Sequence, residues 1–136
     1  MTLTGHHIDL WTLQLAQWRR ASALGIELID ITTKSGDARF APGWDIIQLV
    51  KRVPELTQAG IDTYTKLYRE RMLASYRNYE SRWLEILAKD AVALACYCPP
   101  NTFCHRHLLV DYFKKVGEHH GVVINMRGEL LPEAKG

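Results

Sequence analysis

The sequence predicts an α/β domain with a short, mainly parallel sheet. Short apolar segments rich in β-branched residues alternate along the chain with amphipathic segments at helical spacing. This alternation is typical of parallel strands joined by helical crossovers. The length of 136 residues is that of one domain, so we expect residues 1–136 to fold as a single unit.

Bulk composition narrows the range of partners and compartments. The net charge of +2 is too small to indicate a nucleic-acid or membrane partner. No apolar run approaches the ~20 residues that span a bilayer, and Met1–Trp11 lacks the basic region of a signal peptide. We therefore expect a protein of the reducing cytosol, whose three cysteines are thiols or ligands rather than a disulfide framework.

The amino-terminal part predicts a helix followed by a strand. Apolar residues recur at helical spacing over Ile8–Leu24, and Gly25 is a suitable stop because glycine takes positive φ at low cost. The next segment, Ile26–Thr33, is apolar and β-branched, which predicts a buried strand. We expect its carboxylate, Asp30, to accept hydrogen bonds from nearby backbone amides.

The region between this strand and the next is long and predicted to be helical. One helix covers about Trp44–Arg52 and ends at Pro54, which lacks an amide donor. Asp62 is placed to cap a second helix over Thr63–Tyr76, and a third helix follows. We expect this helical insertion to form a lobe over the sheet edge.

Two parts of this region offer ligand contacts. Lys34, Ser35 and Gly36 directly follow a predicted strand, where loops of parallel sheets line ligand crevices. Tyr64, Tyr68 and Arg71 share one helix face and could hold an anionic, ring-bearing ligand. The alternatives are a solvated turn for the loop, and tyrosines that pack on the core beside an extended arginine for the helix.

The carboxyl-terminal part predicts two more strands around a helix. Ala91–Cys96 is nearly continuous in apolar residues and reads as a strand buried on both faces. An amphipathic helix begins near His105, and Val122–Asn125 forms a third short strand. We expect Arg127–Glu129 to turn into a frayed tail.

Cysteines, histidines and an arginine crowd the junction between the second strand and its helix. Cys96 and Cys98 stand two apart, so they share a side of an extended strand. Thr102 is a candidate N-cap, which places Cys104 in the first helical turn, together with His105 and Arg106. Unpaired N–H groups and the helix dipole stabilise anions there and lower the pKa of a thiol.

Three interpretations of this junction compete. One is an anion pocket in which Arg106 and the helix N-terminus face Lys34. Another is a nucleophilic thiolate, Cys104 or Cys98, with His105 or His107 as its base. A third is a metal site built from Cys98, Cys104 and one or both histidines, although the spacing matches no standard zinc knuckle. Cys96 is best explained as a small buried core residue.

Three blocks in the chain resemble domain-of-unknown-function family 488 (DUF 488). They are IDITTKSGDARFAPGW at Ile29–Trp44, the pair Tyr64 and Tyr68 with the following RML, and LACYCPPNTFCHRHLL at Leu94–Leu109. They are similar to the branch with DxTxKSG…FAPxW and CYC…FCHR blocks, over about Trp11–Met126.

The resemblance implies a small Rossmann-like, three-layer fold and a single site, but no reaction, because the family is named for its unknown activity. It also implies a first strand near the amino terminus, for which Thr2–His6 gives no pattern. The site residues that it implies are Lys34, Ser35, Gly36, Trp44, Tyr64, Tyr68, Cys98, Cys104, His105 and Arg106.

Together these observations predict that the protein binds a small anionic, nucleotide-like ligand at the carboxyl ends of the strands. The predicted binding residues are Lys34, Ser35, Gly36, Trp44, Tyr64, Tyr68, Arg71, Arg106 and His107. A thiol-dependent enzyme using Cys104 or Cys98 with His105, and a metal-dependent enzyme using the cysteine–histidine cluster, are the alternatives. The sequence leaves the identity of any cofactor open, and the exposed side of the tyrosine-rich helix is a candidate homodimer surface.

Overall fold

The architecture is an α/β domain built on four parallel strands. The computed structural model describes residues 3–51, 57–98 and 103–132. The strand order is β2-β3-β1-β4, and all three pairings are parallel. The strands are β1 (His7–Gln14), β2 (Glu27–Asp30), β3 (Ala91–Cys96) and β4 (Val123–Glu129). This confirms the predicted fold class.

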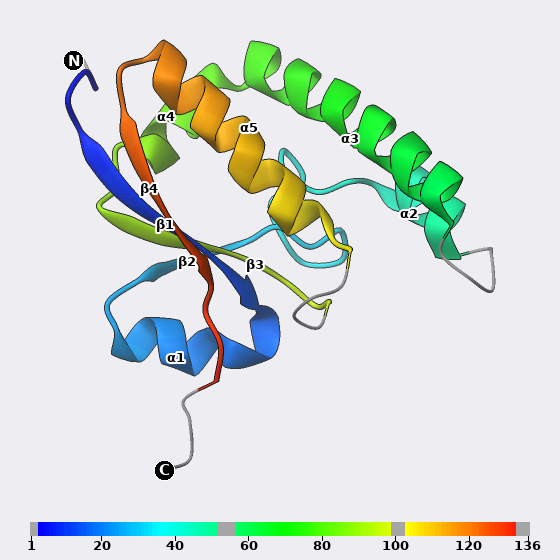
Figure 1. Ribbon diagram of the computed structural model, residues 1–136, viewed down its shortest axis with the longest axis horizontal. Coiled ribbons are helices and arrows are strands. Elements are labelled where there is room, and N and C mark those ends of the chain that lie inside the picture. The colour runs from blue at the N-terminus through cyan, green and yellow to red at the C-terminus, as the bar shows by residue number, and fades with distance from the viewer. Residues whose placement is uncertain (1–2, 52–56, 99–102, 133–136) are drawn as a thin grey trace.

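Helices cover both faces of the sheet, which gives three layers. A short turn η1 (Leu15–Gln17) leads into α1 (Trp18–Ala23), which lies on one face of the sheet. On the other face lie α3 (Gln58–Asn78), α4 (Glu80–Leu87) and α5 (His105–His119), as Figure 1 shows. The predicted helical insertion is confirmed between β2 and β3, where α2 (Trp44–Lys51) precedes α3 and α4.

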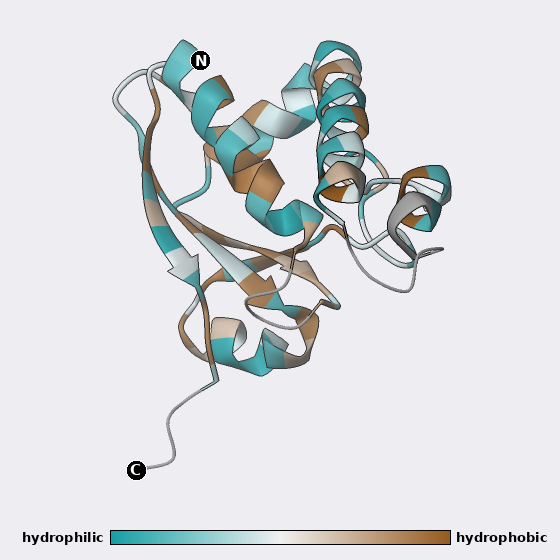
Figure 2. Cartoon of the chain, turned by 45° about the vertical axis from the view of Figure 1, so that its right-hand side comes forward, coloured by the Kyte–Doolittle hydropathy of each residue, from teal (hydrophilic) through white to brown (hydrophobic). Residues whose placement is uncertain are grey.

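Alternation along β3 assigns its side chains to two cores. Val92, Leu94 and Cys96 join the larger core beneath α3, α4 and α5. Ala93 and Ala95 join the smaller core beneath α1, where short side chains suit a close helix. Figure 2 shows that α3 alternates between hydrophilic and hydrophobic residues.

The helix predicted over Ile8–Leu24 is wrong for its first part, Ile8–Gln14, whereas Leu15–Ala23 is helical. Residues His7–Gln14 form β1, which lies inside the sheet between β3 and β4. Burial in β1 follows the two-residue period of a strand, with Ile8, Leu10 and Thr12 buried, and Ile8, Trp11 and Leu15 match helical spacing only by coincidence. The predicted stop holds, because Gly25 has a φ of 72° directly after the C-cap of α1.

Three further boundary predictions are corrected. Helix α3 begins at Gln58 and is capped by Thr57, whose side chain accepts from the Gly60 amide at 3.0 Å. Asp62 lies inside this helix instead of capping it. Arg127–Glu129 belongs to β4 and is not a turn into the tail.

Some predictions fall on undescribed residues or at their edge. Arg52, Pro54 and Thr102 lie outside the described residues. The N-cap position of α5 is held by Cys104, so of the three residues predicted in its first turn only His105 and Arg106 stand there. Among the described residues, no helix is long and apolar enough to cross a membrane.

Candidate functional site

A cavity of about 270 Å³ opens beyond the carboxyl ends of β2 and β3. Its wall comes from the loop after β2, from α2, from α3 and from the junction between β3 and α5. This is the edge at which parallel α/β sheets place their ligands. The lining residues are Thr32, Thr33, Lys34, Trp44, Ile47, Tyr64, Cys96, Tyr97, Cys98, Phe103, Cys104 and His105.

The loop after β2 is a tight turn held by its own hydrogen bonds. The Asp30 carboxylate accepts from the Thr32 amide at 2.9 Å and from the Ser35 hydroxyl at 2.8 Å. A Cβ on Gly36 would lie 2.5 Å from the carbonyl oxygen of Asp30 and from the amide nitrogen of Thr32. These contacts confirm the role expected for Asp30, and they fix the turn from which Lys34 lines the cavity.

The floor of the cavity is a cluster of thiols and one imidazole. Strand β3 ends at Cys96, and Cys104 caps α5, so their Sγ atoms come within 2.7 Å of each other. His105 Nδ1 lies 3.6 Å from Cys104 Sγ. On the other side of the ring, His105 Nε2 donates to the carbonyl oxygen of Ile31 at 2.7 Å, which fixes the ring orientation.

Arg106 lies behind this floor and is fully buried, with 0% of its surface exposed. Its Nε and Nη2 donate to the two carboxylate oxygens of Glu129, each at 3.1 Å. Its Nη1 donates to Cys96 Sγ at 2.7 Å and to the carbonyl oxygen of Cys98 at 2.9 Å. The guanidinium therefore ties β4 to the end of β3, and it faces the sulfurs instead of the cavity.

The electrostatics of the floor differ from one thiol to the next. Hydrogen bonds from the Cys104 and Cys96 thiols, helped by the charge of Arg106, hold the pKa of Cys98 far below its usual range. The hydrogen bonds to Cys96 and Cys98, together with burial, raise the pKa of Cys104. Burial lowers the pKa of His105, which favours the neutral form of its ring.

Aromatic rings and one unpartnered hydroxyl complete the wall. Trp44 is 54% exposed although it lines the cavity, whereas Tyr64 is buried with its ring against Phe103 at 5.0 Å between centroids. Thr33 Oγ1 is buried and has no hydrogen-bond partner among the described residues. A buried hydroxyl without a partner is energetically costly.

Half of the predicted site residues line this cavity. The structure brings together six of them: Lys34, Trp44, Tyr64, Cys98, Cys104 and His105. They come from four separate segments of the chain, so only folding joins them.

The other predicted residues lie outside the lining of the cavity. The Ser35 hydroxyl contacts Asp30, Thr32 and Tyr97, and the Tyr68 hydroxyl donates to the carbonyl oxygen of Phe40 at 2.7 Å. Arg71 Nε donates to the carbonyl oxygen of Ala41 at 2.6 Å. The remaining members of this group are Gly36, Arg106 and His107.

Sequence reasoning missed several contributors. Cys96 is a core residue as expected, with 1% exposure, but its Sγ also faces Cys104 and Arg106. Its spacing of two from Cys98 was the available signal. The sequence gives no signal for Glu129, because its partner Arg106 is 23 residues away along the chain. The other lining residues not singled out are Thr32, Thr33, Ile47, Tyr97 and Phe103.

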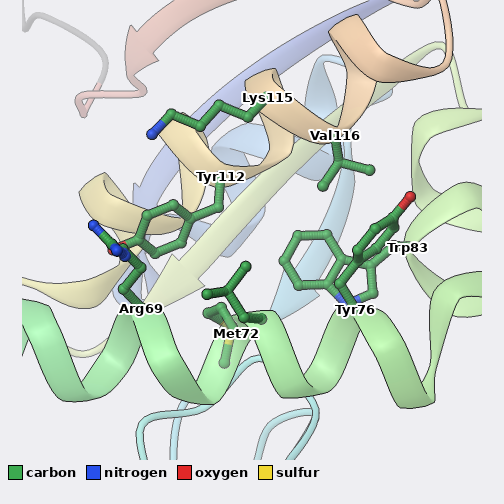
Figure 3. Close-up of a pocket in the computed structure, with 8 residues that line it drawn as sticks. Arg69, Met72, Tyr76, Trp83, Tyr112, Lys115 and Val116 are labelled. Atoms are coloured by element: carbon green, nitrogen blue, oxygen red, sulfur yellow. The ribbon is translucent and has the colours of Figure 1, made fainter.

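A second cavity lies between α3, α4 and α5, away from the sulfur cluster. It measures about 380 Å³ and is mainly apolar, with Met72, Trp83 and Val116 in its lining. Figure 3 shows Arg69 on α3 beside Tyr112 on α5, with Lys115 further along α5. We call this cavity the helical groove and the first one the strand-end cavity.

Comparison with known proteins identifies a family but no individual relative. No curated protein and no solved structure matches the chain. A family model described as the active DUF488-N3 subclade matches residues 37–117. This match spans α2 to α5, including the sulfur cluster, and it covers more than half of the chain. The chain therefore belongs to the DUF488 family, in its active DUF488-N3 subclade.

Proposed function

We propose that the strand-end cavity binds a small ligand with a flat ring and an anionic group, as in a nucleotide. The observation that carries the proposal is the cavity lining. Aromatic rings, a lysine and an unpartnered hydroxyl surround one space at the carboxyl edge of a parallel sheet. Ligand cavities in such sheets typically combine apolar walls with a few polar groups.

The ring of the ligand would lie against Trp44. Its indole is 54% exposed at the mouth of the cavity, beside the partly buried Ile47. Stacking of a base on such a ring contributes about 1–3 kcal/mol to binding. The buried Tyr64 and the partly buried Phe103 would close the apolar wall on the inner side.

The anionic group would face Lys34 and the amino-terminal end of α5. Lys34 is exposed at the rim of the cavity, and α5 begins at His105 in the floor. The first N–H groups of a helix favour negative charge. We assign Arg106 a different role from the one expected, because its described hydrogen bonds go to Glu129 and to the β3 terminus. It would hold the floor in place.

The test is isothermal titration calorimetry with three matched probes: a nucleoside monophosphate, the corresponding nucleoside, and inorganic phosphate. We expect the monophosphate to bind more tightly than either half. Lys34→Ala should weaken binding of the monophosphate more than binding of the nucleoside. Lys115→Ala, in the helical groove, should leave the affinity for the monophosphate unchanged. Equal affinities for wild type and Lys34→Ala, or no binding of any probe, would contradict the proposal.

A further inference from the structure

We propose that Cys96, Cys104 and His105 bind a soft divalent metal ion such as Zn²⁺, with one coordination position open to the strand-end cavity. The ligand atoms of these three residues all lie within 4.8 Å of one another. The inference rests on the proposed function only for what would occupy the open position.

The donor set is the first argument. Thiolate sulfur and imidazole nitrogen are the donors that Zn²⁺ prefers in proteins. All three side chains are buried, with exposures of 1%, 4% and 7% for Cys96, Cys104 and His105. Each of them also lines the cavity, so an ion has a path of entry.

The orientation of His105 is the second argument. Because Nε2 donates to the carbonyl oxygen of Ile31 at 2.7 Å, the lone pair of a neutral ring is on Nδ1. Nδ1 is the atom that faces Cys104 Sγ, at 3.6 Å. A histidine that binds a metal through one nitrogen and donates to a backbone carbonyl through the other is the usual arrangement.

Charge balance is the third argument. Two thiolates neutralise a divalent ion, and the pair of Arg106 with Glu129 is itself neutral. The ion, its two thiolates, Arg106 and Glu129 together therefore carry no excess charge. Arg106 Nη1, which donates to Cys96 Sγ at 2.7 Å, would then stabilise a metal-bound thiolate from outside the coordination sphere.

The geometry requires one adjustment. In a tetrahedral zinc site, with Zn–S distances of about 2.3 Å, two thiolates stand ~3.8 Å apart. Cys96 and Cys104 would therefore separate by about 1 Å from the 2.7 Å between their sulfurs. The Nδ1 to Sγ distance of 3.6 Å between His105 and Cys104 needs little change.

Cys98 would border the open position without being a ligand. It is half-buried at the mouth of the floor and is not in the group whose ligand atoms all lie mutually close. Three protein ligands with a fourth position left for water or substrate are the pattern of catalytic zinc sites. An anionic oxygen of the bound molecule fits that position.

The test uses the reduced, full-length protein and no organic ligand. Protein purified without chelator is analysed for metals, and the metal-free protein is then titrated with Co²⁺, whose thiolate charge-transfer and d–d absorption report tetrahedral sulfur coordination. We expect roughly one ion per chain. Cys104→Ser and His105→Asn should each weaken Co²⁺ binding by more than the 10–100-fold typical of changes outside the coordination sphere.

Two matched variants serve as controls. Cys98→Ser and His107→Asn should keep wild-type stoichiometry and spectrum, because neither residue belongs to the group. Loss of the ion in Cys98→Ser would show that Cys98 is itself a ligand, and would contradict the proposal of an open coordination position.

Other results would overturn the metal site itself. Absence of cobalt bands in the reduced wild type would do so even if the variants failed to fold. So would a disulfide between Cys96 and Cys104 in protein purified without reductant and free of metal. Since no nucleotide enters these measurements, their failure is distinct from a failure of the monophosphate to bind.

Discussion

The strand-end cavity and the helical groove differ in chemistry more than in size. The helical groove is the larger, at about 380 Å³ against about 270 Å³. Two of its polar groups are paired within the protein: Trp83 Nε1 donates to Ser75 Oγ at 3.0 Å, and the Tyr76 hydroxyl contacts His120 Nε2 at 2.7 Å. The strand-end cavity instead holds thiols, an oriented imidazole and the unpartnered hydroxyl of Thr33.

This difference follows from how each cavity forms. The helical groove lies where the sides of packed helices diverge, so it inherits the apolar stripes that face the core. The strand-end cavity lies where strands stop and loops begin, so backbone turns bring thiol, imidazole and ammonium groups from distant segments to one place. The proposed ligand site is therefore the smaller of these two cavities.

The largest expected effect concerns the buried support of the strand-end cavity. Arg106→Ala leaves Glu129 and the β3 terminus without their buried cation, and should lower the free energy of unfolding by about 3–5 kcal/mol. Urea denaturation measures this. The control Arg69→Ala, an exposed residue of the helical groove, should change stability by less than about 0.5 kcal/mol. Similar losses of unfolding free energy in both variants would contradict the supporting role assigned to Arg106.

A substitution in the turn that carries Lys34 should lower the stability of the protein nearly as much. Gly36→Ala places a Cβ 2.5 Å from backbone atoms of Asp30 and Thr32, so the turn must shift. We expect a loss of about 1–3 kcal/mol in unfolding free energy, together with weaker binding of the monophosphate. Gly60→Ala, in the first turn of α3, is the matched control and should be close to neutral. Unchanged stability in Gly36→Ala would refute the role given to this turn.

Loss of the exposed ring should affect ligand binding without affecting the fold. Trp44→Ala removes the stacking surface and should weaken the nucleoside monophosphate by roughly 10-fold, with an unchanged melting temperature. Tyr112→Ala in the helical groove is the paired comparison and should leave affinity as it is. Calorimetry on both variants decides between the two cavities.

The smallest expected effect is a pH dependence in the loop that follows the Lys34 turn. Burial alone would raise the pKa of Asp37, but hydrogen bonds from Arg39 and Arg82 outweigh it and lower the pKa. The resulting stability is present above the unfolded-state pKa and is lost as pH falls through the folded-state value. Asp37→Asn should therefore destabilise the protein by about 1 kcal/mol at neutral pH, and by less in acid.

The matched control for this pH dependence is Asp62→Asn on the exposed side of α3, measured by urea denaturation across pH. If the unfolding free energy of the wild type and that of Asp37→Asn change in parallel as the pH falls into the acid range, Asp37 makes no such contribution.

The parts of the fold that sequence predicts well are those with one strong local pattern. The strand Ala91–Cys96 was predicted with its observed bounds, because a continuous apolar run ends shortly before two prolines. Strand β1 was missed because its hydrogen bonds and its burial depend on β3 and β4, which lie far away in sequence. The spacing of apolar residues within the segment does not show that it pairs with these distant strands.

The candidate site was predictable in its residue types but not in its directions. Family blocks brought forward Lys34, Trp44, Cys104 and His105, and the fold places them around one cavity. The same blocks could not show that Arg106 faces away from the cavity, because that depends on Glu129 in β4. The direction of a side chain at the start of a helix depends on the residue that it contacts in the folded protein. The spacing of residues along the sequence does not identify that residue.

The most direct test of the strand-end cavity as the ligand site is an NMR titration of the ¹⁵N-labelled protein with the nucleoside monophosphate. The account predicts chemical-shift changes at Thr32–Lys34, at Tyr97–Cys98 and at the indole N–H of Trp44. Shifts confined to Met72, Tyr76 and Val116 in the helical groove, with the strand-end cavity unchanged, would contradict it.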